Sequence, residues 1–131
     1  MIGLDTNILV RYLTQDDPRQ SPKATELIEQ RLTEQDPGFI SVVAMAEIVW
    51  VLERAYGFAD EDIAAAVERM LQADVLVVES EREVFTAMVA LKEGQGSFAD
   101  ALIGALGAKA GCSRTLTFDR NAARLAGFEL A

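Results

Sequence analysis

Histidine is absent from this chain of 131 residues, and cysteine and tryptophan each occur once. Without histidine there can be no Ser-His-Asp triad, no Cys-His pair and no zinc site built on imidazole. The single cysteine, Cys112, cannot form an internal disulfide or a thiolate metal cage, so we expect it to be a small buried residue. Oxygen-ligand metal chemistry remains possible.

Long apolar runs and an excess of positive charge are also missing. No run approaches the roughly 20 residues that cross a bilayer, and the start at Met1 shows no charged leader or cleavage site. We therefore expect a cytoplasmic protein that does not enter a membrane. Twelve basic and twenty-one acidic residues give a net charge of -9, which opposes non-specific attachment to nucleic acid. A polyanionic substrate would therefore need favourable local contacts to bind.

Half of the residues are hydrophobic, which suits one domain over residues 1–131 with one substantial core. The apolar pattern predicts short strands at 2–4, 39–41, 75–78, 115–118 and 128–130. Helices are predicted between them, including 6–13, 42–56, 98–110 and 120–125. This alternation predicts an α/β fold, a three-layer α/β/α sandwich with a mainly parallel central sheet.

Several helix ends carry recognisable signals. Ser21 before Pro22 is predicted to be an N-cap, and Asp60 is predicted to cap the helix that follows it. Ser80 with Glu83 has the pattern of a capping box, and Gly57 is expected to end the helix that begins at Val42.

Four carboxylates stand in largely apolar stretches, at Asp5, Glu47, Asp100 and Asp119. Placing carboxylates in apolar surroundings costs free energy unless they bind a cation, and we expect that cation to be a divalent metal ion. Asp5 and Asp119 directly follow predicted strands, and ligands of parallel α/β folds bind beyond the carboxyl ends of the strands. Glu47 lies in a helix that is apolar around most of its circumference, which predicts a largely buried helix.

Each acid also has a purely structural interpretation. Asp5 and Asp119 could cap the helices that begin after them, and Asp119 could pair with Arg120. Glu47 could be an ordinary solvated glutamate, and Asp100 could form a capping box with Ser97.

Glycines, cations and aromatic side chains around the acids add weaker signals. Gly104 and Gly107 let the helix after Asp100 approach a neighbouring element closely. Arg11, Arg120 and Arg124 could hold phosphates, although solvated helix positions are favoured. Four aromatic side chains could stack on bases or line a groove for a second copy or a partner, although core roles are favoured. They are Tyr12, Trp50, Tyr56 and Phe98.

The ordered motifs resemble those of a PIN domain, specifically of the VapC-like toxins of type II toxin-antitoxin systems. They are Ile2-Gly3-Leu4-Asp5-Thr6-Asn7, Glu47 in its apolar helix, Phe98-Ala99-Asp100-Ala101-Leu102-Ile103 and Thr115-Leu116-Thr117-Phe118-Asp119. The resemblance covers essentially the whole chain in the family's motif order.

This resemblance implies an Mg²⁺- or Mn²⁺-dependent endoribonuclease whose acidic ligands are Asp5, Glu47, Asp100 and Asp119. It further implies a homodimer that a VapB-type antitoxin inhibits. Thr6 and Asn7 match the polar neighbours of the first motif. Thr117, two residues before Asp119 in an extended segment, should point to the same face, so all three are candidate positioners of water or phosphate.

The chemistry follows from the residues as well, because hydrolysis of a phosphodiester needs charge stabilisation and a nucleophile made from water. We expect Asp5 to be the principal ligand, with the other three acids completing or orienting the shell. Two alternatives belong to other classes, a phospho-acceptor receiver module and a catalytically silent partner-binding protein. The receiver fits less well, because Asp5 stands alone at the first strand and no lysine follows Lys109.

Overall fold

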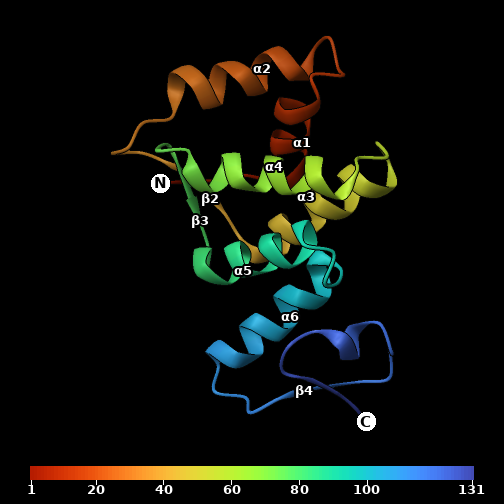
Figure 1. Cartoon of the computed structure of the whole chain (residues 1–131). Helices are drawn as coiled ribbons and strands as arrows, with labels where there is room; N and C mark the ends of the chain where they lie inside the picture. Colours follow the sequence, from red (N-terminus) through yellow and green to blue (C-terminus); the bar gives the residue numbers. More distant parts are fainter. The chain divides into compact units, whose positions relative to one another are not determined.

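The computed structural model describes every residue from Met1 to Ala131. Its helices are α1 (Thr6–Thr14), α2 (Gln20–Glu26), α3 (Val42–Arg54), α4 (Asp60–Gln72), α5 (Glu81–Lys92) and α6 (Phe98–Lys109). A π-helical turn, η1 (Leu27–Arg31), continues α2, and a 3-10 turn, η2 (Ala122–Arg124), lies near the C-terminus. The strands are β1 (Ile2–Gly3), β2 (Gly38–Ile40), β3 (Leu76–Val78), β4 (Thr115–Thr117) and β5 (Phe128–Leu130) (Figure 1).

All five strands pair in parallel. Strands β1, β2 and β3 form one sheet in that order, with Gly3 opposite Phe39 and Phe39 opposite Val77. Strands β4 and β5 form a second sheet. The chain divides into two compact units, Met1–Glu79 and Ser80–Ala131, and each contains one sheet. The predicted α/β class with parallel strands is thus confirmed, and one domain over the whole chain stays a prediction.

The core of the first unit comes from the inner faces of its helices. Met45, Ile48 and Leu52 of α3 are fully buried at helical spacing, and α3 packs against both α1 and α4. Ile63 and Val67 supply the matching stripe of α4. Burying side chains of this size contributes about 1.5–3 kcal/mol each, so these stripes hold the helices in place.

A polar network joins the end of α1 to the residues that follow α3. Tyr56 donates a hydrogen bond to Asp16, at 2.5 Å between the two oxygens, and Arg11 contacts both carboxylate oxygens of Asp16 at 3.1 Å. Thr14 also donates to Asp16, at 2.8 Å. The hydrogen bonds from Tyr56 and Thr14, with the charge of Arg11, lower the pKa of Asp16 from 3.8 to about 2. Arg11 is therefore committed to a structural ion pair.

The start of α2 differs from the prediction. The helix begins at Gln20, so Ser21 is not its N-cap. Asp17 performs that task, because its Oδ1 accepts hydrogen bonds from the N–H groups of Arg19 and Gln20 at 2.9 and 2.7 Å. Ser21 is buried, and its hydroxyl donates to the carbonyl of Arg11. An alternative acceptor four residues before Ser21 thus competes with it at the helix start.

Two other predicted caps are also wrong. Ala59 precedes α4, so Asp60 lies inside its first turn, where its charge complements the helix dipole. Ser80 has a left-handed backbone with φ of 53° and makes no capping hydrogen bond. Its hydroxyl accepts from Lys109 instead, at 3.1 Å. The cap at Gly57 is confirmed, since its φ of 66° follows the last turn of α3 and its N–H bonds to the carbonyl of Glu53.

The second unit is built on α5 packed against α6. Its buried side chains include Val84 and Met88 of α5 and Phe98 and Leu102 of α6. Gly104 lies against the ring of Phe128, where a Cβ atom would overlap the ring. The predicted close approach is thus present at Gly104, whereas at Gly107 the nearest atom to a Cβ would be Thr115 Oγ1 at 3.5 Å, an ordinary contact.

Cys112 is exposed, so its predicted burial is wrong. It stands in the turn after α6, directly behind Gly111, whose φ of 100° turns the chain away from the helix. None of the helices combines the length and the apolar character that a bilayer span requires.

The two glycines of α6 allow a matched test of packing. Gly104→Ala should lower the free energy of unfolding, because overpacking against Phe128 costs about 1–3 kcal/mol and outweighs a gain of about 1 kcal/mol in helix propensity. Gly107→Ala should raise it by up to about 1 kcal/mol, because no contact opposes that gain. Urea unfolding measures both, and equal effects would contradict the close approach.

The Asp16 network predicts a specific pH dependence. Because the folded pKa of Asp16 lies at about 2, below its unfolded value of 3.8, its stabilising effect is complete above that value. The effect is lost as pH falls through 2. Asp16→Asn should therefore lower Tm near neutral pH, and the difference from the wild type should vanish at about pH 2. Asp74→Asn, at an exposed acid without a hydrogen bond, is the control and should show no such trend.

Candidate functional site

Asp5 lies two residues beyond the carboxyl end of β1. It is the N-cap of α1, and its Oδ1 accepts a hydrogen bond from the N–H of Thr6 at 2.7 Å. The capping role considered for this residue is therefore real, but it occupies only one oxygen. Asp5 is exposed, Asn7 is exposed and Thr6 is buried. A carboxylate at this strand end can still offer its second oxygen to a cation.

Glu47 lies in the second turn of α3, the helix that follows the neighbouring strand β2. Its side chain is exposed and takes part in no hydrogen bond or ion pair. The prediction that α3 is largely buried is wrong on this face, because Val43 and Trp50 are 75% and 58% exposed. The buried stripe of α3 lies on the other side of the helix, so an apolar composition does not require burial all round.

Sequence reasoning missed Glu79, which directly follows β3. Its Oε1 accepts a hydrogen bond from the N–H of Val42 at 2.8 Å and so stabilises the amino end of α3. The signal was available, since an acid after an apolar strand was the same pattern that indicated Asp5. Because β2 separates β3 from β1, Glu79 lies about 10 Å from the end of β1 by strand spacing. We interpret it as a structural cap.

In the second unit, Asp100 lies in the first turn of α6. The hydroxyl of Ser97 accepts a hydrogen bond from the N–H of Asp100 at 3.1 Å. Ser97 is therefore the helix cap, but Asp100 returns no hydrogen bond to it, so the capping box is only half formed. The carboxylate of Asp100 is half-buried and has no partner among the hydrogen bonds and ion pairs.

Asp119 follows β4 after Phe118. Its Oδ1 accepts hydrogen bonds from the N–H groups of Asn121 and Ala122 at 2.8 and 3.4 Å. Thr117 supports this arrangement, because its hydroxyl accepts from the N–H of Asp119 at 3.0 Å. The predicted capping of the next turn is thus observed, whereas Arg120 forms no ion pair with Asp119. The second oxygen of Asp119 is unused.

The four acids share one property that bears on metal binding. None of them forms a salt bridge, and at least one oxygen of each is free of hydrogen bonds. Uncompensated hard oxygen donors are what Mg²⁺ and Mn²⁺ prefer, so the donor set fits such an ion. Asp5 and Glu47 belong to the first unit, Asp100 and Asp119 to the second, and neither unit gathers three possible ligands. Their convergence stays a prediction.

The aromatic side chains divide between the core and the surface. Phe98 is 2% exposed, as predicted for a core residue, and Tyr12 and Tyr56 are half-buried with hydrogen-bonded hydroxyl groups. Trp50 departs from the predicted core role, because more than half of its surface is open. Phe118, beside Asp119, is 90% exposed.

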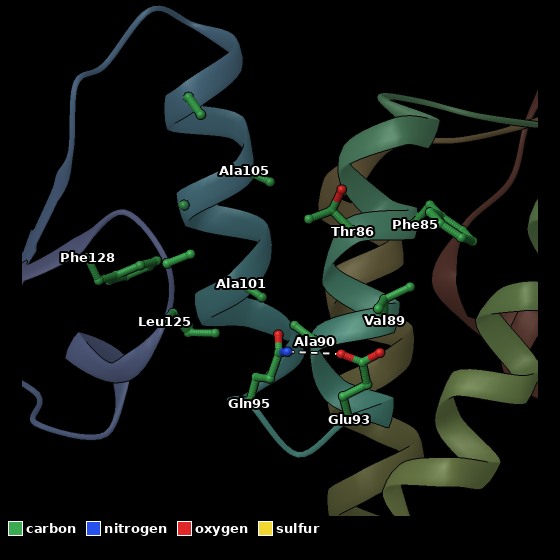
Figure 2. A pocket seen from close by; sticks show the side chains of 13 residues that line it. Phe85, Thr86, Val89, Ala90, Glu93, Gln95, Ala101, Ala105, Leu125 and Phe128 are labelled. Carbon is green, nitrogen blue, oxygen red and sulfur yellow. Dashed lines mark hydrogen bonds between the residues drawn. The ribbon is translucent and has the colours of Figure 1, made fainter.

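A pocket of 510 Å³ in the second unit lies apart from these acids. Figure 2 shows it between α5, α6 and the C-terminal segment, with Val89, Ala101 and Phe128 among its lining residues. Glu93 and Gln95 form a hydrogen-bonded polar edge at 2.9 Å. None of the four acids lines this pocket, so it is not the candidate metal site.

Comparison with known proteins assigns the chain to a family. The family model for the PIN domain matches residues 2–128 and so spans both compact units. The chain belongs to the PIN-domain family. This PIN-domain chain is also 28% identical over 126 residues to a protein named VapC ribonuclease from Aquifex aeolicus (strain VF5). The similarity covers 93% of this chain and 90% of that relative.

Family membership confirms the resemblance seen in the motifs. PIN domains of the nuclease type are phosphodiester hydrolases that depend on metal ions, and the match includes all four acids of this chain.

The hydrogen bonds of the acids predict different effects on stability. Asp119→Ala should lower the free energy of unfolding by about 1 kcal/mol, because two backbone N–H groups lose their acceptor. Glu47→Ala should change it by no more than about 0.5 kcal/mol, because Glu47 has no partner to lose. Urea unfolding of the metal-free protein distinguishes the two, and a larger cost at Glu47 would show that its carboxylate has a structural partner.

Proposed function

We propose that this protein is an Mg²⁺- or Mn²⁺-dependent endoribonuclease, the toxin of a VapBC-type toxin-antitoxin pair. The observation that carries this proposal is the set of four carboxylates with free oxygens in a PIN-domain chain. Its similarity to a protein named VapC ribonuclease supports RNA as the substrate.

We assign metal binding and catalysis to Asp5, Glu47, Asp100 and Asp119. Asp5 is the principal ligand, because it stands at a strand end with one oxygen held by Thr6 and the other free. Glu47 and Asp100 have unpaired carboxylates, which suits them to hold the cation or accept a proton from the attacking water. Asp119 is oriented by its two backbone hydrogen bonds and completes the shell.

The divalent ion, when bound, would neutralise the charge that develops on the phosphoryl oxygens during hydrolysis. The chain contributes the remaining steps. Asn7, exposed beside Asp5, can donate hydrogen bonds to a phosphate oxygen or a water molecule. Thr6 orders Asp5 through its backbone N–H, and Thr117 does the same for Asp119 through its hydroxyl.

Regulation by a partner follows from the same assignment. We propose that a VapB-type antitoxin inhibits the enzyme and that the active form is a homodimer in the cytoplasm. The name of the Aquifex aeolicus relative supports the toxin class. The unneutralised acids provide the chemistry for inhibition, because a basic side chain of a partner could pair with them.

The decisive experiment compares the wild type with Asp5→Asn on total RNA, with cleavage sites mapped in Mg²⁺ and in EDTA. Asp5→Asn should abolish Mg²⁺-dependent cleavage, because an amide is a weaker ligand for a hard cation than a carboxylate. On the proposed convergence of the four acids, the same change should also raise the metal-free Tm, since two like charges brought to about 4 Å would repel by roughly 4 kcal/mol at an effective dielectric of about 20.

Asp74→Asn serves as a matched control, because this exposed acid lies outside the four motifs. It should cleave like the wild type. Cleavage by Asp5→Asn at the wild-type rate would remove Asp5 as the principal ligand. Absence of any Mg²⁺-dependent cleavage by the wild type would instead favour a catalytically silent binding protein.

A further inference from the structure

An exposed stripe along α3 combines an acid, an aromatic ring and a cation. Glu47, Trp50 and Arg54 lie at positions i, i+3 and i+7, within about 60° of arc on a helix that turns about 100° per residue. Trp50 is 58% exposed, and the side chain of Arg54 is 68% exposed. Trp50 is the only tryptophan of the chain. The most extended aromatic surface of the first unit thus lies one turn from Glu47.

The net charge of the protein favours a contact with a polyanionic substrate that does not rest on charge. At a net charge of -9, counterion release supplies little affinity for RNA. Four of the twelve cations are paired, Arg11 with Asp16, Arg54 with Glu53, Lys109 with Glu83 and Arg114 with Glu129. Base stacking does not depend on net charge, and one stacked base changes affinity by roughly 5- to 150-fold.

The composition of the stripe favours a nucleotide over a protein partner. The cores of protein interfaces are depleted of charged residues, whereas here Glu47 and Arg54 flank the ring, and Val43, 75% exposed, is the other large apolar side chain on this face. Arg54 is held only weakly, with Nε at 4.0 Å from the neighbouring Glu53. These three side chains suit neighbouring parts of an RNA chain. Glu47 could bind a metal ion at one phosphate, Trp50 could stack on a base, and Arg54 could pair with the next phosphate.

We propose that Trp50 is a substrate-positioning residue on which an unpaired base of the RNA stacks, next to the phosphate that is cleaved at the acidic site. This inference rests on the proposed ribonuclease function. Arg54 contacts a neighbouring phosphate of the same strand. The stacked base must be unpaired, because a base inside a duplex has no free face for the ring.

The single tryptophan gives a readout that is independent of cleavage. The full-length protein in EDTA is titrated with a short single-stranded RNA, and Trp50 emission is followed. Saturable quenching is expected if a base covers the ring. No quenching would overturn the proposal. A shift in emission that depends on protein concentration without RNA would also overturn it, because a second copy would then cover Trp50.

Kinetics in Mg²⁺ provide the second readout. Trp50→Ala should raise KM by roughly 5- to 150-fold, the effect of one lost stacked base, with kcat within about 3-fold of the wild type. Trp50→Phe keeps a stacking ring and should largely restore KM. Phe85→Ala, which removes a 52% exposed aromatic from α5, is the matched control and should leave KM unchanged.

The possible outcomes distinguish a failure of the stacking role of Trp50 from a failure of the proposed ribonuclease function. An unchanged KM for Trp50→Ala, or a fall in kcat alone, would overturn the stacking role while leaving the ribonuclease intact. Trp50→Phe guards against misfolding, since a folded variant with a KM as high as that of Trp50→Ala would also contradict stacking. Absence of cleavage by the wild type overturns the ribonuclease function, whereas quenching in EDTA still reports whether a base covers Trp50.

Discussion

Four carboxylates without cationic partners are the feature on which the candidate site of this protein depends. Asp5, Glu47, Asp100 and Asp119 form no salt bridge, in a chain that has twelve basic residues to offer. The backbone orients two of them through hydrogen bonds, at Thr6 and at Asn121, without neutralising them. A protein that keeps acids in this state has hard oxygen ligands available for a cation.

The same acidity shapes how a polyanion can be held. At least one of the twelve basic side chains has a structural role, because Arg11 pairs with Asp16. An exposed indole can bind a base by a contact that does not depend on net charge. On the proposed role of Trp50, its position one turn from Glu47 would connect base stacking to the acidic residues through one helix.

Much of the secondary structure could be predicted, because short apolar strands and helical stripes are local patterns. The strands at β2, β3 and β5 lie within a residue of their predicted bounds, and α6 ends one residue before the predicted Ala110. Helix starts were less predictable, because several acceptors compete locally. Asp17 took the capping role expected of Ser21, and Lys109 engaged the hydroxyl expected to cap α5. Asp17 is a local competitor of Ser21, whereas Lys109 lies 29 residues from Ser80 and is not visible in a local capping pattern.

By itself, the sequence determined the class of chemistry. The absence of histidine and the order of the four acidic motifs point to oxygen-ligand metal chemistry in a PIN-domain chain, since ligand type follows from residue type. Only the tertiary structure decided which surfaces are open. Trp50 and Cys112, both expected to be buried, are exposed, and Glu47 lies on a free face of an apolar helix. Burial depends on what packs against a residue, and those neighbours are distant in the chain.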